Sequence, residues 1–141
     1  MYECAHFEIH ELVPPDLFEK YRDQQWKLWN LFDDRALITN DQLREVFGKI
    51  IINDWHWRGN YKDSGFRTPD CKIGAEWSQH KFGRGFDLKF KDTDVKEVRH
   101  RILQNKQQFE FINSIELGTL TWLHFDTRNV KKSERILTFK P

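Results

Sequence analysis

Two histidines and one aspartate, in segments far apart in the chain, most constrain how this sequence can fold. His80 and Asp87 stand seven residues apart, and His124 follows much later within the run 122–126. Two imidazoles and one carboxylate can bind zinc while the fourth tetrahedral position stays open for water, as in catalytic zinc sites. The sequence therefore predicts a fold that brings residues 78–87 against the segment around His124, and a metallohydrolase if the three side chains converge.

The composition indicates one ordered domain over residues 1–141. The formal net charge is +1, and no block of like charges provides the basic face of a nucleic-acid binder. No apolar run approaches the length of a membrane-spanning helix. The segment 1–6 lacks the basic start and apolar stretch of a signal peptide, so we expect synthesis in the cytoplasm. Cys4 and Cys71 form no metal-binding pair motif, and we expect two reduced thiols.

Local signals predict three helices. Proline suits the first helical turn, so Pro15 is expected to open a helix that the polar run 22–25 could divide in two. Thr39 or Asn40 can cap a second helix, whose end a glycine marks. Asp94 can cap the third helix, because a glutamate follows three residues later.

Alternating and β-branched residues predict a small antiparallel sheet flanked by helices, which is an α+β domain. Asp87 falls on the polar face of its strand because Phe86 and Leu88 alternate with it. His124 and Asp126 likewise share a face that points away from the core. The expected strands are 50–52, 86–90, the two arms of a hairpin within 109–126 that turns at 117–119, and an edge strand at 135–139.

Three side chains are candidates for supporting roles around the predicted metal site. Asp126 could orient the imidazole of His124 through its free ring N–H, and Ser78 could act in a similar way. His56 stands between two tryptophans and could line a substrate cleft. The alternative for His56 is simple packing between the two indoles.

Two further side chains are candidates for catalysis. Glu116 is the candidate general base: if 117–119 is the whole loop, Glu116 pairs with Leu120 and shares the face of His124. A two-residue loop would put it on the opposite face, and an exposed turn carboxylate is the plain alternative. Arg67 is the candidate clamp, because a guanidinium can hold a carbonyl or carboxylate through two parallel hydrogen bonds. Its alternative is a salt bridge to a nearby loop aspartate.

Three segments together resemble one family of zinc peptidases. Residues 78–87 resemble the S-x-H-x-x-G-x-A-x-D motif of the zinc D-alanyl-D-alanine carboxypeptidases, whose fold is shared by phage L-alanyl-D-glutamate endopeptidases and the hedgehog signalling domain. Residues 64–69, Ser-Gly-Phe-Arg-Thr-Pro, resemble the family's S-G-[YF]-R-[ST] segment, and 122–126 resembles its late H-x-D strand. The three motifs occur in family order, and the resemblance covers 39–128.

The resemblance implies zinc bound by His80, Asp87 and His124, and a peptidase that hydrolyses the peptide stems of bacterial peptidoglycan. The chain departs from the family at two positions. Gly85 replaces an alanine, and Thr121 stands where many members carry an acid three residues before the second ligand histidine. The catalytic carboxylate must therefore come from elsewhere, or the protein is not a hydrolase.

Two classes of function stay open at this stage. The expected substrate is the cell wall, which lies outside the membrane, whereas we expect no export signal in the chain. Together these expectations favour a phage lysis enzyme or a virion-borne enzyme. Trimming of D-Ala-D-Ala dipeptides in the cytoplasm is a third setting. The rival class, which the hedgehog comparison suggests, is a non-catalytic zinc-binding domain that recognises a partner. Thr121 favours this rival, whereas Glu116 and Arg67 favour the enzyme.

Overall fold

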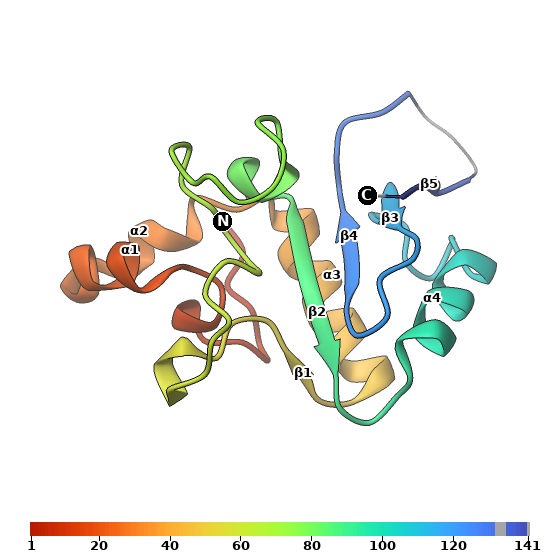
Figure 1. The fold of residues 1–141 in the computed structure, drawn as a ribbon, viewed down its shortest axis with the longest axis horizontal. Coiled ribbons are helices and arrows are strands. Elements are labelled where there is room, and N and C mark those ends of the chain that lie inside the picture. The colour runs from red at the N-terminus through yellow and green to blue at the C-terminus, as the bar shows by residue number, and fades with distance from the viewer. Residues whose placement is uncertain (132–134, 141) are drawn as a thin grey trace.

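Five short strands form one mixed sheet in the computed structural model, which describes residues 1–131 and 135–140 (Figure 1). Neighbouring strands run antiparallel except the last pair, which is parallel. The order across the sheet is β1 (Ile50–Ile51), β2 (Gly85–Phe90), β4 (Leu123–Asp126), β3 (Ser114–Glu116) and β5 (Leu137–Phe139).

The α+β class is confirmed, but the expectation of a purely antiparallel sheet is wrong at its edge. Ser114 pairs with Leu137 and Glu116 with Phe139, so β5 runs in the same direction as β3. Hydrogen bonds from Leu137 N to Asn113 O and from Leu117 N to Phe139 O fix this direction. A strand signal in the sequence carries no information on direction, which depends on where the chain re-enters the sheet.

Two of the helix starts match the sequence prediction. Pro15 opens α1, and Asp94 caps α4 by accepting a hydrogen bond from Lys96 N at 2.8 Å. Within the described ranges, no helix has both the length and the apolar character needed to cross a lipid bilayer. The helices are α1 (Pro15–Lys20), α2 (Trp26–Trp29), α3 (Asp34–Phe47) and α4 (Val95–Gln104), with 3-10 turns η1 (Ile9–Glu11), η2 (Arg22–Gln24), η3 (Trp55–Trp57) and η4 (Gln79–Phe82).

The helix α3 begins earlier than the sequence predicted. Asp33 caps it, because its carboxylate accepts a hydrogen bond from Arg35 N at 3.0 Å. Thr39 and Asn40, the predicted caps, therefore lie inside the helix and are buried. Asp33 thus satisfies a backbone N–H that would otherwise be free at the start of the helix. It lies more than one helical turn before the two predicted caps.

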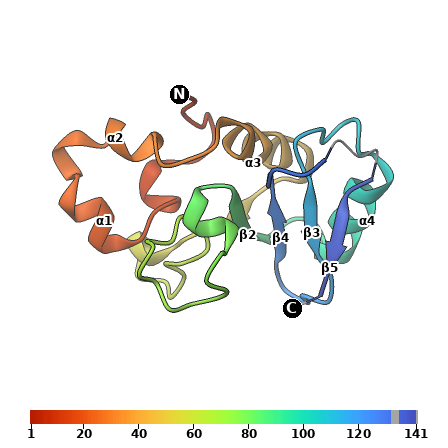
Figure 2. The same ribbon diagram turned by 90° about the horizontal axis from the view of Figure 1, so that it is seen from above.

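The apolar core lies on one face of the sheet, where α3 passes behind β2 and β4, and α4 lies beyond β3 (Figure 2). Phe86 and Leu88 of β2 and Leu123 and Phe125 of β4 are fully buried there. Because side chains alternate along a strand, the residues between them face the other side of the sheet. That other face carries Asp87 and His124.

The connection from β3 to β4 corrects the predicted hairpin. It spans residues 117–122 rather than 117–119, so Glu116 does not pair with Leu120. Ser114 lies opposite Asp126 and Ile115 opposite Phe125, and continuing this register by one residue brings Glu116 opposite His124. Glu116 thus shares the face of His124, as expected, but through a different register.

A glycine after η4 holds His80 in place. Gly83 adopts φ of +65°, and a Cβ added there would lie 2.0 Å from the backbone oxygen of Leu31. Its own carbonyl accepts a hydrogen bond from Asp33 N at 3.0 Å, which ties the turn that carries His80 to the cap of α3. Only glycine fits both the backbone conformation and the close approach.

We predict that Gly83→Ala destabilises the fold far more than Gly118→Ala. Gly118 also has a positive φ, +93°, but a Cβ there would meet nothing within 4 Å. Gly118→Ala should therefore cost only the left-handed backbone strain of about 1–2 kcal/mol, whereas Gly83→Ala should cost at least ~2 kcal/mol more through the clash. Urea unfolding of both variants measures the difference, and equal losses would contradict the described packing of Gly83.

Candidate metal centre

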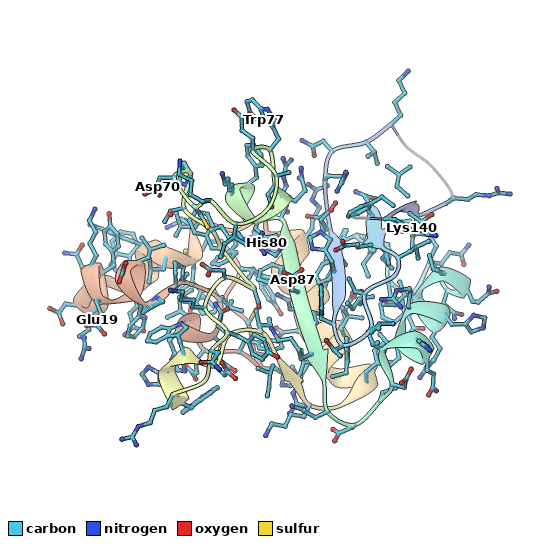
Figure 3. All side chains as sticks on the ribbon, viewed as in Figure 1. Glu19, Asp70, Trp77, His80, Asp87 and Lys140 are labelled. Carbon is cyan, nitrogen blue, oxygen red and sulfur yellow. The ribbon has the colours of Figure 1, made fainter. Side chains whose placement is uncertain are left out.

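Three ligand atoms converge on the polar face of the sheet. His80 comes from η4, and Asp87 and His124 come from β2 and β4, where they are direct cross-strand partners. Asp87 Oδ1 lies 2.8 Å from His124 Nδ1 and 3.4 Å from His80 Nε2, and the two nitrogens are 3.3 Å apart. Figure 3 shows His80 and Asp87 next to each other between β2 and the loops that precede it. The group could hold a metal ion.

The spacing of these atoms fits a small cation. Ligands bound at about 2.0–2.1 Å in tetrahedral geometry lie roughly 3.3 Å from one another. The observed separations of 2.8, 3.3 and 3.4 Å are close to that value without any rearrangement. The two ring nitrogens and the carboxylate oxygen converge on one point, which suits a shared cation.

Hydrogen bonds on the far sides of the rings fix which nitrogen faces the centre. His80 Nδ1 lies 2.8 Å from the carbonyl oxygen of Gly65 and donates to it. His124 Nε2 lies 3.3 Å from Asp126 Oδ2, and Arg128 holds that carboxylate through Nε at 2.7 Å and Nη2 at 2.6 Å. Each imidazole thus offers its other nitrogen to the centre, an arrangement common around metal-binding histidines. Asp126 lies where the sequence predicted it.

Arg67 fixes the carboxylate ligand. Its Nη2 donates to Asp87 Oδ2 at 3.1 Å, which leaves Oδ1 for the centre. Its Nε and Nη1 donate to the backbone oxygens of Asp63 at 2.7 Å and Ile73 at 3.4 Å, and the residue is only 8% exposed. The partner acid is therefore Asp87 and not a loop aspartate. The role of Arg67 as a clamp on substrate stays a prediction.

Burial and mutual contacts set the charges of the three ligands. Burial alone would raise the pKa of Asp87, but hydrogen bonds from His124 and His80 outweigh it and hold that pKa far below its usual range. Burial lowers the pKa of His80. For His124, burial is outweighed by hydrogen bonds to Asp126 and Asp87, which raise its pKa to about 9.

A cavity of about 590 Å³ opens beside the three ligands. Glu116, Ser78 and Arg67 line it together with the ligands, so the structure brings these predicted residues together. Ser78 precedes η4, and its carbonyl accepts from Lys81 N at 3.0 Å; its predicted support of a ligand stays a prediction. Trp77, which is 73% exposed, stands at the tip of its loop above His80 (Figure 3).

Sequence reasoning missed three residues at this centre. Arg128 follows Asp126 by two positions, and the strand alternation could have suggested it. Phe139 of β5 packs edge-on against the ring of His124, with centroids 5.9 Å apart, and lies under the Arg128 guanidinium. Gly65 contributes only a backbone oxygen. No local sequence signal points to Phe139 or Gly65.

His56 lies in a separate aromatic group and does not line this cavity. Its ring stacks on His10 with centroids 4.1 Å apart and meets Trp55 and Trp57 edge-on at 5.4 and 6.2 Å. Packing against the indoles, the alternative interpretation, therefore describes its surroundings. Burial and the neighbouring His56 both lower the pKa of His10. Within the described chain, His10 Nε2 is buried with no hydrogen-bond partner.

Comparisons of the chain with models of protein families, with curated proteins and with solved structures found no match.

We predict that protonation of His10 destabilises the fold as the pH falls. Because its pKa is lower in the folded protein, the unfolded chain binds more protons below about pH 6.5, so the stabilisation is present above that pH and lost beneath it. His10→Gln should remove this part of the pH dependence, whereas His100→Gln on the exposed face of α4 should keep it. Urea unfolding at about pH 7.5 and about pH 5.5 tests this; parallel pH profiles for the parent and His10→Gln would refute it.

We also predict that the protein binds one divalent metal ion per chain and that binding stabilises the fold. His80→Asn and His124→Asn should abolish binding, and Asp126→Asn should weaken it by about 10–100-fold because the imidazole loses its orienting carboxylate. His100→Asn is the matched control. Metal content by mass spectrometry and thermal unfolding with and without chelator measure both effects. Undiminished metal in His80→Asn would place the ion elsewhere.

Proposed function

We propose that this chain is a zinc-dependent peptidase that hydrolyses peptide stems of bacterial peptidoglycan. The observation that carries the proposal is the triangle of His80 Nε2, Asp87 Oδ1 and His124 Nδ1 beside an open cavity. Two imidazoles and one carboxylate form a zinc donor set that leaves a position for water or substrate. The resemblance of 64–69 and the two ligand segments to zinc D-alanyl-D-alanine carboxypeptidases supplies the substrate class.

The surrounding residues would hold the reacting groups in order. Zinc, when bound, supplies Lewis acidity toward a peptide carbonyl and a water molecule. Arg67 holds Asp87, and Gly65 and Asp126 hold the two imidazoles, so the ligands need no rearrangement. Such preorganisation avoids a reorganisation cost during the reaction.

Glu116 is the proposed general base. It is the last residue of β3 and lines the same cavity as His124. Its carboxylate would accept a proton from the attacking water and return it to the nitrogen of the leaving amine. Thr121, which has no acidic group, cannot take this role although the family resemblance points to its position.

A non-catalytic zinc domain is the second candidate, and Thr121 is the observation that favours it. In that case the zinc would stabilise the fold, and the exposed indoles of Trp77 and Trp122 at the cavity would contact a partner. A stem-peptide substrate, in contrast, lies outside the bacterial membrane and favours a phage lysis or virion enzyme. Measured turnover separates the two functions.

We expect zinc-loaded protein to release fragments from purified stem peptides, and Glu116→Gln to lower the rate by about 10²–10⁴-fold. Glu116→Gln should retain its zinc and its folded spectrum, because the side chain is not a ligand. Glu110→Gln, which removes an exposed carboxylate, is the matched control. Chromatography with mass spectrometry measures the products. Full activity in Glu116→Gln would exclude Glu116 as the base. A zinc-loaded parent protein without activity would reject the peptidase and favour the non-catalytic zinc domain.

A further inference from the structure

Two exposed aromatic rings lie parallel to each other next to the candidate metal centre. The indole of Trp77 and the ring of Phe82 have centroids 6.3 Å apart and planes only 6° from parallel, which is an offset stack. Trp77 is 73% exposed and Phe82 is 44% exposed. Trp77 also lines the cavity that contains the three ligands, above His80 (Figure 3). We call the pair Trp77 and Phe82 the aromatic ledge.

The position of the aromatic ledge is fixed relative to the metal ligands. Phe82 and His80 belong to the same 3-10 turn, η4. The guanidinium carbon of Arg84 lies 5.1 Å from the centre of the Phe82 ring. The backbone of Arg84 is held on both sides, since its N–H donates to Gln79 O at 3.0 Å and its carbonyl accepts from Thr127 N at 3.0 Å. A ligand on the ledge would therefore lie at a defined place beside the centre.

The exposure of these rings indicates a binding surface. Ile73, on the same loop as Trp77, is 50% exposed and lines the same cavity, so the apolar surface extends from the ledge toward the ligands. Contiguous exposed apolar surface rimmed by polar groups marks interaction sites in soluble proteins. A flat, exposed indole suits a ligand that is itself flat on one face.

Polar groups beside the ledge narrow the chemistry of that ligand. Within residues 1–131 and 135–140, no acceptor bonds the indole N–H of Trp77. Gln79 lines the cavity, and its Oε1 is buried without a hydrogen-bond partner among the same residues. Its amide can therefore rotate toward the cavity without breaking a hydrogen bond of the described chain. A purely apolar ligand would leave both groups unmatched.

A sugar ring has both properties. One face of a pyranose carries C–H groups, which pack on an indole, and its rim carries hydroxyl and N-acetyl groups, which donate and accept hydrogen bonds. The N–H of Trp77 and the oxygen of Gln79 are a donor and an acceptor of the kind such a rim requires.

The distance between the ledge and the metal centre suits a sugar with a peptide attached. Trp77 precedes His80 by three residues, so their backbones lie at most about 11 Å apart. In peptidoglycan, each stem peptide is joined to a sugar of the glycan strand, and an extended peptide advances about 3.5 Å per residue. With that sugar on the ledge, one of the first few residues of the stem would reach the centre.

We propose that the aromatic ledge, Trp77 stacked on Phe82, binds a sugar ring of the glycan strand while the attached stem peptide lies at the metal centre. This inference rests on the proposed peptidase function. It adds that the substrate is a stem peptide still joined to its glycan rather than a free peptide. The domain would thus hold the cell wall through its own surface.

Binding of two matched ligands tests the proposal apart from catalysis. The probes are a stem peptide joined to the disaccharide of the glycan strand and the same peptide with an N-terminal acetyl group in place of the sugar. Calorimetry uses zinc-loaded Glu116→Gln protein, in which turnover is expected to be slow. The sugar-bearing peptide should bind about 3–10-fold more tightly, the range expected for one aromatic stacking contact. Equal affinities, or no binding of either probe, would overturn the proposal.

Substitutions on the exposed surface identify the residues responsible. In the same background, Trp77→Ala should remove the preference for the sugar-bearing peptide, and Trp77→Phe should keep part of it. Phe82→Leu should reduce the preference, because the indole loses its flat support. Trp26→Ala is the matched control, since Trp26 is a 59% exposed indole on α2 that does not line this cavity, and the preference should be unchanged. A preference that persists in Trp77→Ala would contradict the assignment.

The disaccharide alone separates this inference from the peptidase proposal. In NMR spectra of the parent protein, the indole N–H signal of Trp77, identified by its absence in Trp77→Phe, should shift when disaccharide is added, and that of Trp26 should not. Such a shift, without hydrolysis of any stem peptide, keeps the sugar site and rejects the peptidase. Hydrolysis of stem peptides with no shift and with equal affinities keeps the peptidase and rejects the sugar site.

Discussion

The antiparallel pairing of β2 with β4 is the constraint on which the candidate site depends. It sets Asp87 directly opposite His124, so that a carboxylate oxygen and a ring nitrogen meet at 2.8 Å. The same register buries Phe86 and Phe125 on the other face. A slip of one residue would turn the ligands into the core and the phenylalanines toward solvent. The free energy of burying the core therefore also holds the metal ligands in position.

The polar face of the sheet carries a network of paired charges around the three ligand side chains. Arg67 binds Asp87, and Arg128 binds Asp126, so each carboxylate has its own guanidinium. His124 is buried between the two carboxylates, and its hydrogen bonds to Asp126 and Asp87 outweigh the effect of burial and raise its pKa to about 9. Buried charges of this kind are stabilising only when each is matched.

The sequence was sufficient to predict the elements whose signals are local. Alternation along β2 and β4 placed Asp87 and His124 on the polar face, and the cap at Asp94 was readable from side-chain chemistry alone. The length of the loop between β3 and β4 could not be predicted in this way, because Arg99 of α4 holds Thr119 by hydrogen bonds at 3.0 and 2.7 Å. That contact joins residues 20 positions apart and has no local signal.

The rest of the site depends on long-range packing in the same way. The approach of Phe139 to His124 follows from the parallel pairing of β5 with β3, which the sequence does not specify. The acceptor for His80 is a backbone oxygen, and backbone groups are the same at every residue.

A crystal structure of the zinc-loaded protein, with anomalous scattering measured at the zinc edge, tests the central claim most directly. The account predicts one zinc peak about 2.0–2.2 Å from His80 Nε2, Asp87 Oδ1 and His124 Nδ1, with His124 Nε2 still bound to Asp126. A peak elsewhere in the chain, or coordination of His124 through Nε2, would contradict it.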